Sequence, residues 1–233
     1  MRPFPQVLVF DFDGVILESA DIKTRAFREL FAPYPDRLAA IVAYHEANAG
    51  ISRFLKFRHI HEHILGRPLG LDEERGLGER FSALVVEEVI RCPFVPGALE
   101  CLQAYSREYP LFLASGTPED ELHRLVEARS LSAFFRGIYG SPKGKAAIIE
   151  EILAVTAKPS AAVLFVGDGR SDYEAAKAAG VAFVGRGRPG RYHPFEGLDV
   201  PVVEDLFALD RYLGGRLVDQ PAGSRGTSGG GTA

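Results

Sequence analysis

Short apolar runs recur along this chain, and each stops at Gly, Ser or Asp before a segment with helical periodicity. We expect three buried strands and two shorter ones, over residues 7–10, 111–114, 163–166, 138–139 and 182–184. Strands that alternate with helices form a mostly parallel sheet that is covered on both faces. The alternation therefore predicts a three-layer, Rossmann-like α/β fold, in which ligands bind beyond the carboxyl ends of the strands.

Residues 19–91 differ from the rest, because they show helical periodicity and no convincing strand. We expect helices over 20–31, 36–46, 51–65 and 71–90. A Pro-Phe-Val-Pro-Gly segment follows, and its prolines disfavour continuation of the helix. We therefore predict a core domain of residues 1–18 and 92–215 with an inserted all-helical cap domain, 19–91. The last residues, 216–233, are expected to form a disordered tail.

The composition excludes several classes of protein. Apolar residues make up 46% of the 233 residues and charged residues 25%, and no run reaches the ~18 uncharged apolar residues that a membrane span needs. The formal net charge of −4 argues against a large nucleic-acid-binding surface. Since the amino terminus lacks the pattern of a secretory signal, we expect a cytoplasmic protein with no nucleic-acid or membrane partner.

Two carboxylates, Asp11 and Asp13, follow the first predicted strand. Side chains at positions i and i+2 of a strand lie on the same face, so both acids are expected to project from its carboxyl end. Adjacent carboxylates repel each other unless a cation or a shared proton offsets their charge, and Mg²⁺ takes oxygen ligands of this kind. A metal site is therefore the first hypothesis.

Polar residues also follow the strand predicted over 111–114. Here Ser115, Gly116 and Thr117 offer a hydroxyl and loop amides that could hold phosphate oxygens. An ordinary helix start is the alternative, with Thr117 as the N-cap and Pro118 in the first helical position.

Two further segments carry charged residues next to predicted strands. Asp168 and Asp172 follow a buried strand and are accompanied by glycines, and the alternative for either acid is an Asx turn that caps the next helix. Lys143 and Lys145 precede a helix predicted over 146–153. A lysine at a helix amino terminus is electrostatically disfavoured, so it calls for a nearby anion, although a solvated surface lysine is equally acceptable.

Taken together and in this order, these segments resemble the four motifs of the haloacid dehalogenase superfamily of phosphatases. The similarity spans residues 5–210 and includes a helical cap after the first motif, as in the phosphoglycolate-phosphatase-like branch. The matching motifs are Asp11-Phe-Asp13-Gly-Val, then Ser115, then a lysine of Lys143-Gly-Lys145, then Gly167-Asp168-Gly-Arg-Ser-Asp172.

The resemblance implies a role for each acid. Asp11 is implied to be the nucleophile that attacks phosphorus and forms an aspartyl-phosphate. Asp13 is implied to protonate the leaving alcohol and later to activate water. Mg²⁺ is implied beside Asp11 and Asp168, with Asp13 binding through its backbone carbonyl. Asp172 is implied either to contact the metal through water or to orient the lysine of the third motif.

The resemblance also implies a clamp for the phosphoryl oxygens, formed by Ser115, with Gly116 and Thr117 beside it, and by the lysine. Lys145 is preferred because it begins the predicted helix, whereas Lys143 fits a motif variant whose following proline is absent here. An acid at position 13 favours phosphate esters over carbon–halogen bonds, because a departing halide needs no proton.

Basic residues in the cap provide a further expectation. In related proteins the cap closes over the core and contacts the leaving group, so Arg53 and Lys56 are candidate substrate-binding residues. A solvated helix face is the alternative. A second basic segment, 185–191, lacks the context of a dinucleotide fingerprint and is interpreted as a mobile basic loop.

These observations predict a Mg²⁺-dependent phosphatase that hydrolyses a small phosphorylated metabolite through an aspartyl-phosphate. A phosphomutase acting on a sugar phosphate would use the same core residues and is the first alternative. A binding module without turnover is the second, and the complete set of chemically competent residues argues against it. The sequence determines neither the substrate nor the oligomeric state.

Overall fold

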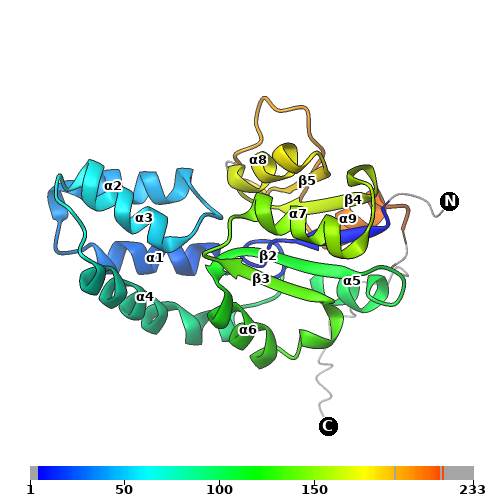
Figure 1. Cartoon of the computed structure of the whole chain (residues 1–233), viewed down its shortest axis with the longest axis horizontal. Coiled ribbons are helices and arrows are strands. Elements are labelled where there is room, and N and C mark those ends of the chain that lie inside the picture. The colour runs from blue at the N-terminus through cyan, green and yellow to red at the C-terminus, as the bar shows by residue number, and fades with distance from the viewer. Residues whose placement is uncertain (1–4, 192, 216, 218–233) are drawn as a thin grey trace, which may run out of the picture.

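The computed structural model describes residues 5–191, 193–215 and 217, and these form a parallel sheet flanked by helices (Figure 1). The six strands of the described chain lie in the order β3-β2-β1-β4-β5-β6. They are β1 (Val7–Phe10), β2 (Leu111–Pro118), β3 (Gly137–Ser141), β4 (Val163–Gly167), β5 (Ala182–Arg186) and β6 (Val202–Val203). Because β2 and β4 lie on either side of β1, the strand order reverses at β1, and such sheets bind ligands at the point of reversal.

Helices cover both faces of the sheet, and the strands alternate their side chains between the two. Val7 and Val9 pack with one set of helices, whereas Leu8 and Phe10 pack with the other. The first set is α7 (Lys145–Thr156) and α8 (Arg170–Ala179), and the second is α5 (Ala98–Tyr105), α6 (Glu119–Ala128) and α9 (Leu206–Tyr212). Short 3₁₀ turns, η2 (Ser132–Phe134) and η3 (Ser160–Ala162), precede β3 and β4. The predicted three-layer α/β fold is confirmed.

The residues between β1 and α5 form helices that lie to one side of the sheet (Figure 1). They are α1 (Ala20–Leu30), α2 (Pro35–Ala47), α3 (Arg53–His59) and α4 (Leu71–Arg91). Where the sequence predicts one helix over 51–65, α3 instead starts at residue 53 and widens into a π-helical turn, η1 (Ile60–Ile64). A hydrogen bond of 2.8 Å, from Leu65 N to Ile60 O five residues earlier, defines this turn.

Aromatic side chains fill the interior of this helical segment. Phe27 lies at its centre, with its ring 5.0 Å from that of Phe81 and 5.7 Å from that of Phe57. These rings belong to the same apolar cluster as Leu8 and Phe10 of β1. The helical segment therefore packs against the sheet through continuous apolar contacts, and we retain its division from the core at residues 18 and 92 as a proposal.

Two other predictions concern the chain as a whole. Within the residues that the structure describes, no helix has the length and apolar character that crossing a membrane requires. The tail predicted over 216–233 lies outside the described residues except for residue 217.

Candidate active site

Polar residues lie where the three central strands end. Asp11 directly follows β1, Ser115 lies in the last part of β2, and Asp168 directly follows β4. The backbone of the first loop is fixed to the sheet, since Asp11 N donates to Val166 O at 2.9 Å. Because the strands are parallel, their carboxyl ends meet, and all three side chains line one cavity, as the sequence predicts.

Asp11, Asp168 and Asp172 form a carboxylate cluster in which one oxygen of each lies within 4.8 Å of the others. Gly14 lets Asp168 come close to the loop that follows β1, because a Cβ on Gly14 would lie only 1.9 Å from Asp168 Oδ2. The backbone of Gly14 also has φ +76°, which favours glycine. Burial raises the pKa of Asp11 well above its ordinary value. Burial and the neighbouring Asp172 raise the pKa of Asp168 to about 7. Joint ionisation of these acids is therefore unfavourable unless a cation offsets their charge.

This donor set fits a magnesium ion. Carboxylate oxygens are the ligands that Mg²⁺ prefers, and a divalent cation would offset the repulsion among the acids. Asp11 and Asp168 also line the cavity between cap and core, whereas Asp172 is not among the residues that line it and accepts hydrogen bonds on both oxygens. Asp172 Oδ1 accepts from Lys145 Nζ, and Asp172 Oδ2 accepts from Gly169 N at 2.9 Å. These contacts favour orientation of the lysine over direct metal binding for Asp172.

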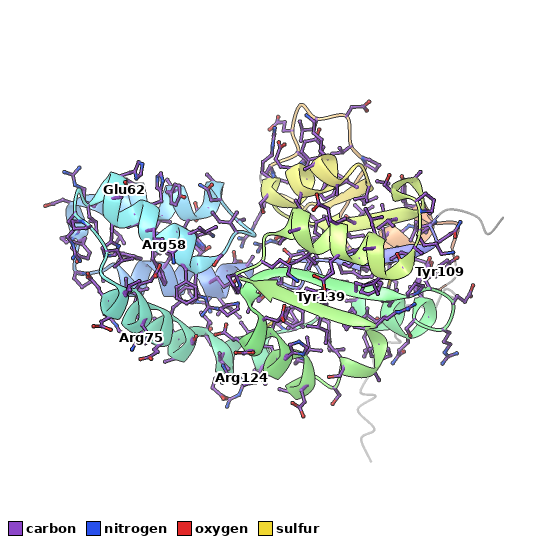
Figure 2. The ribbon with its side chains drawn as sticks, viewed as in Figure 1. Arg58, Glu62, Arg75, Tyr109, Arg124 and Tyr139 are labelled. Carbon is purple, nitrogen blue, oxygen red and sulfur yellow. The ribbon has the colours of Figure 1, made fainter. Side chains whose placement is uncertain are left out.

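The structure separates the two candidate lysines. Lys145 is buried, and its Nζ lies 2.9 Å from Asp11 Oδ2 while also contacting Asp172. Burial lowers the pKa of Lys145, but these two carboxylates outweigh burial, so the net pKa is raised and the ammonium stays charged. Lys143 is exposed outside the cluster, where it pairs with Glu151 and lies near the ring of Tyr139 (Figure 2).

Asp13 accepts hydrogen bonds from three side chains. Ser19 Oγ donates to its Oδ1 at 2.6 Å, Thr117 Oγ1 donates to its Oδ2 at 3.0 Å, and Lys23 Nζ forms an ion pair with Oδ2. Burial raises the pKa of Asp13, but Lys23 and the hydrogen bonds outweigh burial, so the net pKa is lowered. Sequence reasoning missed Lys23 as a site residue, although Ser19 and Lys23 are four residues apart and hence share one face of α1.

Thr117 does not cap a helix, so the alternative interpretation of this residue is wrong. Strand β2 continues to Pro118, beyond its predicted end, and α6 begins at Glu119 with no side-chain cap. The hydroxyl of Thr117 bonds to Asp13 and Lys23 instead. Its backbone N donates to Ser115 Oγ at 3.2 Å, which orients that hydroxyl.

A cap loop lies directly on these core residues. Ser171 Oγ of α8 donates to Ala49 O at 2.8 Å, which ties the loop between α2 and α3 to the core. A Cβ on Gly116 would lie 2.4 Å from Gly50 O, so this position admits only glycine. A Cβ on Gly50 would lie 3.0 Å from Lys145 Nζ. The cap is therefore closed over the carboxylate cluster.

Arg53 is buried, but its guanidinium is occupied by the protein itself. Its Nη1 donates to Glu121 Oε2 of α6 at 3.0 Å and to Ser82 Oγ of α4 at 2.8 Å, and its Nη2 bonds the second Glu121 oxygen. Arg53 thus joins the cap to the core. The sequence could not show this, because Glu121 is 68 residues away in the chain.

The basic segment 185–191, interpreted from the sequence as a mobile basic loop, begins in β5 and forms ion pairs. Arg186 is buried at the end of β5 and pairs with Glu18. Arg188 and Arg191 each donate to Asp21, in the first turn of α1, at 2.9 Å. Acidic residues on both sides of the predicted boundary between residues 18 and 19 therefore hold this segment against the start of the cap.

These elements enclose a cavity of about 810 Å³ between the cap and the core. Core residues supply the acids and Ser115, and the cap supplies Lys23, His45 and Lys56. Lys56 is 4% exposed and lines this cavity, and among the described residues it forms no ion pair within 4.0 Å. The chain is thus shaped to enclose a small molecule next to the carboxylate cluster.

Comparison with known proteins gives the family. Residues 5–180 match the model of the haloacid dehalogenase-like hydrolases, and the chain belongs to this family. The sequence-based prediction that the chain belongs to this superfamily is confirmed, and so is the prediction that it is a hydrolase of the phosphatase type.

Two curated relatives come from Pseudomonas. The phosphoglycolate phosphatase of Pseudomonas savastanoi pv. phaseolicola is 30% identical over 190 residues, which cover 77% of this chain and 68% of that protein. The phosphoglycolate phosphatase of Pseudomonas syringae pv. tomato is 31% identical over 190 residues, with the same coverage.

Solved structures share the fold. A predicted phosphoglycolate phosphatase from Haemophilus somnus has a TM-score of 0.70 at 17% identity and covers 90% of this chain and 98% of its own. CbbY from Rhodobacter sphaeroides, in complex with phosphate, has a TM-score of 0.68 at 23% identity and covers 91% of this chain and 97% of its own. These similarities show the α/β fold of the chain.

Proposed function

We propose that this chain is a Mg²⁺-dependent phosphatase that hydrolyses a small phosphate monoester through an aspartyl-phosphate on Asp11. The observation that carries the proposal is that Asp11, Asp168 and Ser115 line one cavity and that Lys145 Nζ lies 2.9 Å from Asp11 Oδ2. Mg²⁺, when bound by Asp11 and Asp168, supplies positive charge that keeps Asp11 ionised and offsets the charge of the phosphate. We retain the cytoplasm as the proposed location.

In the first step, a carboxylate oxygen of Asp11 attacks phosphorus, and the bond between phosphorus and the ester oxygen breaks. Asp11 is held for this attack, since its Oδ1 accepts from Phe12 N at 2.7 Å and its Oδ2 faces Lys145 Nζ. Asp13 must first take up a proton against the influence of Lys23, and it then gives this proton to the departing alcohol oxygen. Lys145 and Ser115 bind the phosphoryl oxygens and keep them in line with the attacking oxygen.

In the second step, water attacks the phosphorus of the aspartyl-phosphate, and the bond to Asp11 breaks to release inorganic phosphate. Asp13 takes the proton of this water, so it must then be a carboxylate. The contacts from Lys23, Ser19 and Thr117 favour that ionised form. The closed cap limits access of other water to the intermediate.

The names of the relatives suggest a substrate to test first. Two of them are phosphoglycolate phosphatases that match more than two thirds of their own length. Phosphoglycolate is small enough for the enclosed cavity. We therefore propose phosphoglycolate, or another short phosphorylated acid, as the substrate.

Phosphate release by the purified chain tests this function. We expect inorganic phosphate from phosphoglycolate with Mg²⁺ present, and none after chelation of the metal. Asp11→Asn should abolish release because the amide is not a nucleophile. Asp120→Asn is the matched control, since Asp120 is an exposed acid on α6.

Two outcomes would contradict the proposal. One is unchanged phosphate release by the Asp11→Asn variant. The other is an isomerised sugar phosphate without net release of phosphate, which would instead support the phosphomutase.

A further inference from the structure

Lys56, on α3, has a buried side-chain amine. In the described part of the chain, no carboxylate oxygen lies within 4.0 Å of its Nζ. The other cap cations of the cavity are already paired, Lys23 with Asp13 and Arg53 with Glu121. A buried cation without a counter-ion is costly, so its retention here requires a reason.

His45, on α2, holds this amine in place. Lys56 Nζ lies 3.2 Å from His45 Nδ1 and 3.3 Å from His45 O. On the far side of the ring, His45 Nε2 lies 3.2 Å from Thr24 Oγ1, which donates its own proton to Ala20 O at 3.3 Å. The ring proton is therefore on Nε2, and the lone pair of Nδ1 faces Lys56.

This arrangement leaves part of the amine for a ligand. An ammonium group has three N–H donors, and His45 accepts two of them. The ring of Phe27 lies 5.5 Å from Nζ and closes another side. Since Lys56 lines the same cavity as Asp11 and Ser115, its third donor is available to a molecule bound there.

We propose that Lys56, held by His45, binds a carboxylate on the leaving group of the substrate. This inference rests on the proposed function, because it places the phosphoryl group at Asp11 and extends the leaving group toward the cap. One ammonium with one remaining donor matches a single negative charge. A second phosphate group would need more donors than the paired Lys23 and Arg53 leave free.

The charges around Lys56 are consistent with this role. Burial, followed by the nearby Lys23 and Lys145, lowers its pKa to about 7, while Asp13 and Asp168 act in the opposite direction. Burial and Lys56 lower the pKa of His45 to about 2, so the imidazole is neutral and accepts a hydrogen bond. A bound carboxylate would supply the missing counter-charge.

A comparison of three esters tests the proposal. The esters are phosphoglycolate, ethyl phosphate, which lacks a second charge, and ethylene glycol bisphosphate, which carries a second phosphate. For Lys56→Met we expect kcat/KM for phosphoglycolate to fall about 10- to 100-fold, the usual worth of a hydrogen bond to a charged group. The kcat/KM for ethyl phosphate should stay within about threefold of the wild type, because ethyl phosphate has no carboxylate for Lys56 to bind.

Arg58→Met is the matched control, because Arg58 is an exposed cation on the same helix that pairs with Glu74 (Figure 2). Arg58→Met should leave kcat/KM unchanged for all three esters. Equal losses on phosphoglycolate and ethyl phosphate, or no loss on phosphoglycolate, would overturn the proposal. A larger loss on the bisphosphate than on phosphoglycolate would overturn the assignment to a carboxylate.

Binding measurements separate this proposal from the proposed function. In the Asp11→Asn background, calorimetry should show tighter binding of phosphoglycolate than of ethyl phosphate, and Lys56→Met should remove the difference. Equal binding of the two esters before that substitution would overturn the proposal even if hydrolysis is confirmed. If Lys56→Met does not fold, Lys56→Gln and the two-ester comparison in the Asp11→Asn protein decide the question. Absence of hydrolysis with intact discrimination would overturn only the proposed function.

Discussion

The ion pair between Arg53 and Glu121 provides a sharp prediction, because it joins the cap to the core. Both side chains are 4% exposed, and Glu121 also accepts a hydrogen bond from Ser82. Burial raises the pKa of Glu121, but Arg53 outweighs burial, so the net pKa is lowered and the carboxylate is charged. Glu121→Gln removes the charge with almost no change in volume.

The size of the effect follows from the burial of the pair. Loss of one partner of a buried ion pair costs about 3–5 kcal/mol, because the remaining charge is left without compensation. When the cap opens, Arg53 regains contact with water. The cost of leaving its charge unpaired is then present only in the closed state. The ratio of closed to open cap would then fall by about 100-fold or more. Catalysis needs the closed cap, so kcat/KM should fall by up to that factor.

Two measurements on the same variants decide whether this reasoning holds. We expect Glu121→Gln to lower kcat/KM strongly while changing the free energy of unfolding by less than about 1 kcal/mol. Arg53→Met combined with Glu121→Gln should be less impaired than Glu121→Gln alone, since no buried charge remains. Asp120→Asn, in the same turn of α6, is the control. A loss of about 3–5 kcal/mol in unfolding free energy with unchanged kcat/KM would refute the reasoning and make the pair purely structural.

Three further predictions concern single residues of the site. Lys145→Met should reduce kcat by about 100-fold or more, because it removes a charged group from the phosphoryl oxygens, whereas steady-state assays of Lys143→Met should match the wild type. The KM for phosphoglycolate should be constant below pH 7 and rise above it, by about 10- to 100-fold in all, since the substrate stays ionised while Lys56, with a pKa of about 7, loses its proton; a flat KM profile would contradict this. Asp13→Asn should slow turnover by about 100- to 10,000-fold in stopped-flow assays, and a smaller effect on esters with good leaving groups than on alkyl esters would show the lost proton transfer.

The sheet and its acids were predictable because the relevant signals are local. Each strand is a short apolar run, and Asp11 and Asp168 follow directly in sequence from β1 and β4. The carboxyl ends of parallel strands must lie at one edge, so the acids meet whatever the details of packing. Lys145 was the preferred lysine for a similar reason, since it begins α7 and a buried position there faces the acids.

The contacts between cap and core could not be predicted in this way. Lys23 reaches Asp13 and Thr117, which is 94 residues away, only because α1 leaves the sheet at one particular angle. That angle is set by the packing of the aromatic interior of the cap against the sheet, which no periodicity in the sequence describes. For the same reason the sequence does not distinguish Arg53 from Lys56, whereas the structure pairs Arg53 with Glu121 and, among the described residues, gives Lys56 no acidic partner within 4.0 Å.

Direct detection of the covalent intermediate tests the central claim most closely. Protein mixed with phosphoglycolate and Mg²⁺ is quenched in acid during turnover, digested and analysed by mass spectrometry. We predict one added phosphoryl group on the peptide that contains Asp11, located on Asp11 itself, and a larger labelled fraction in the Asp13→Asn variant if breakdown of the intermediate is slowed more than its formation. Turnover without any phosphorylated peptide, or with the phosphoryl group on another residue, would contradict the account.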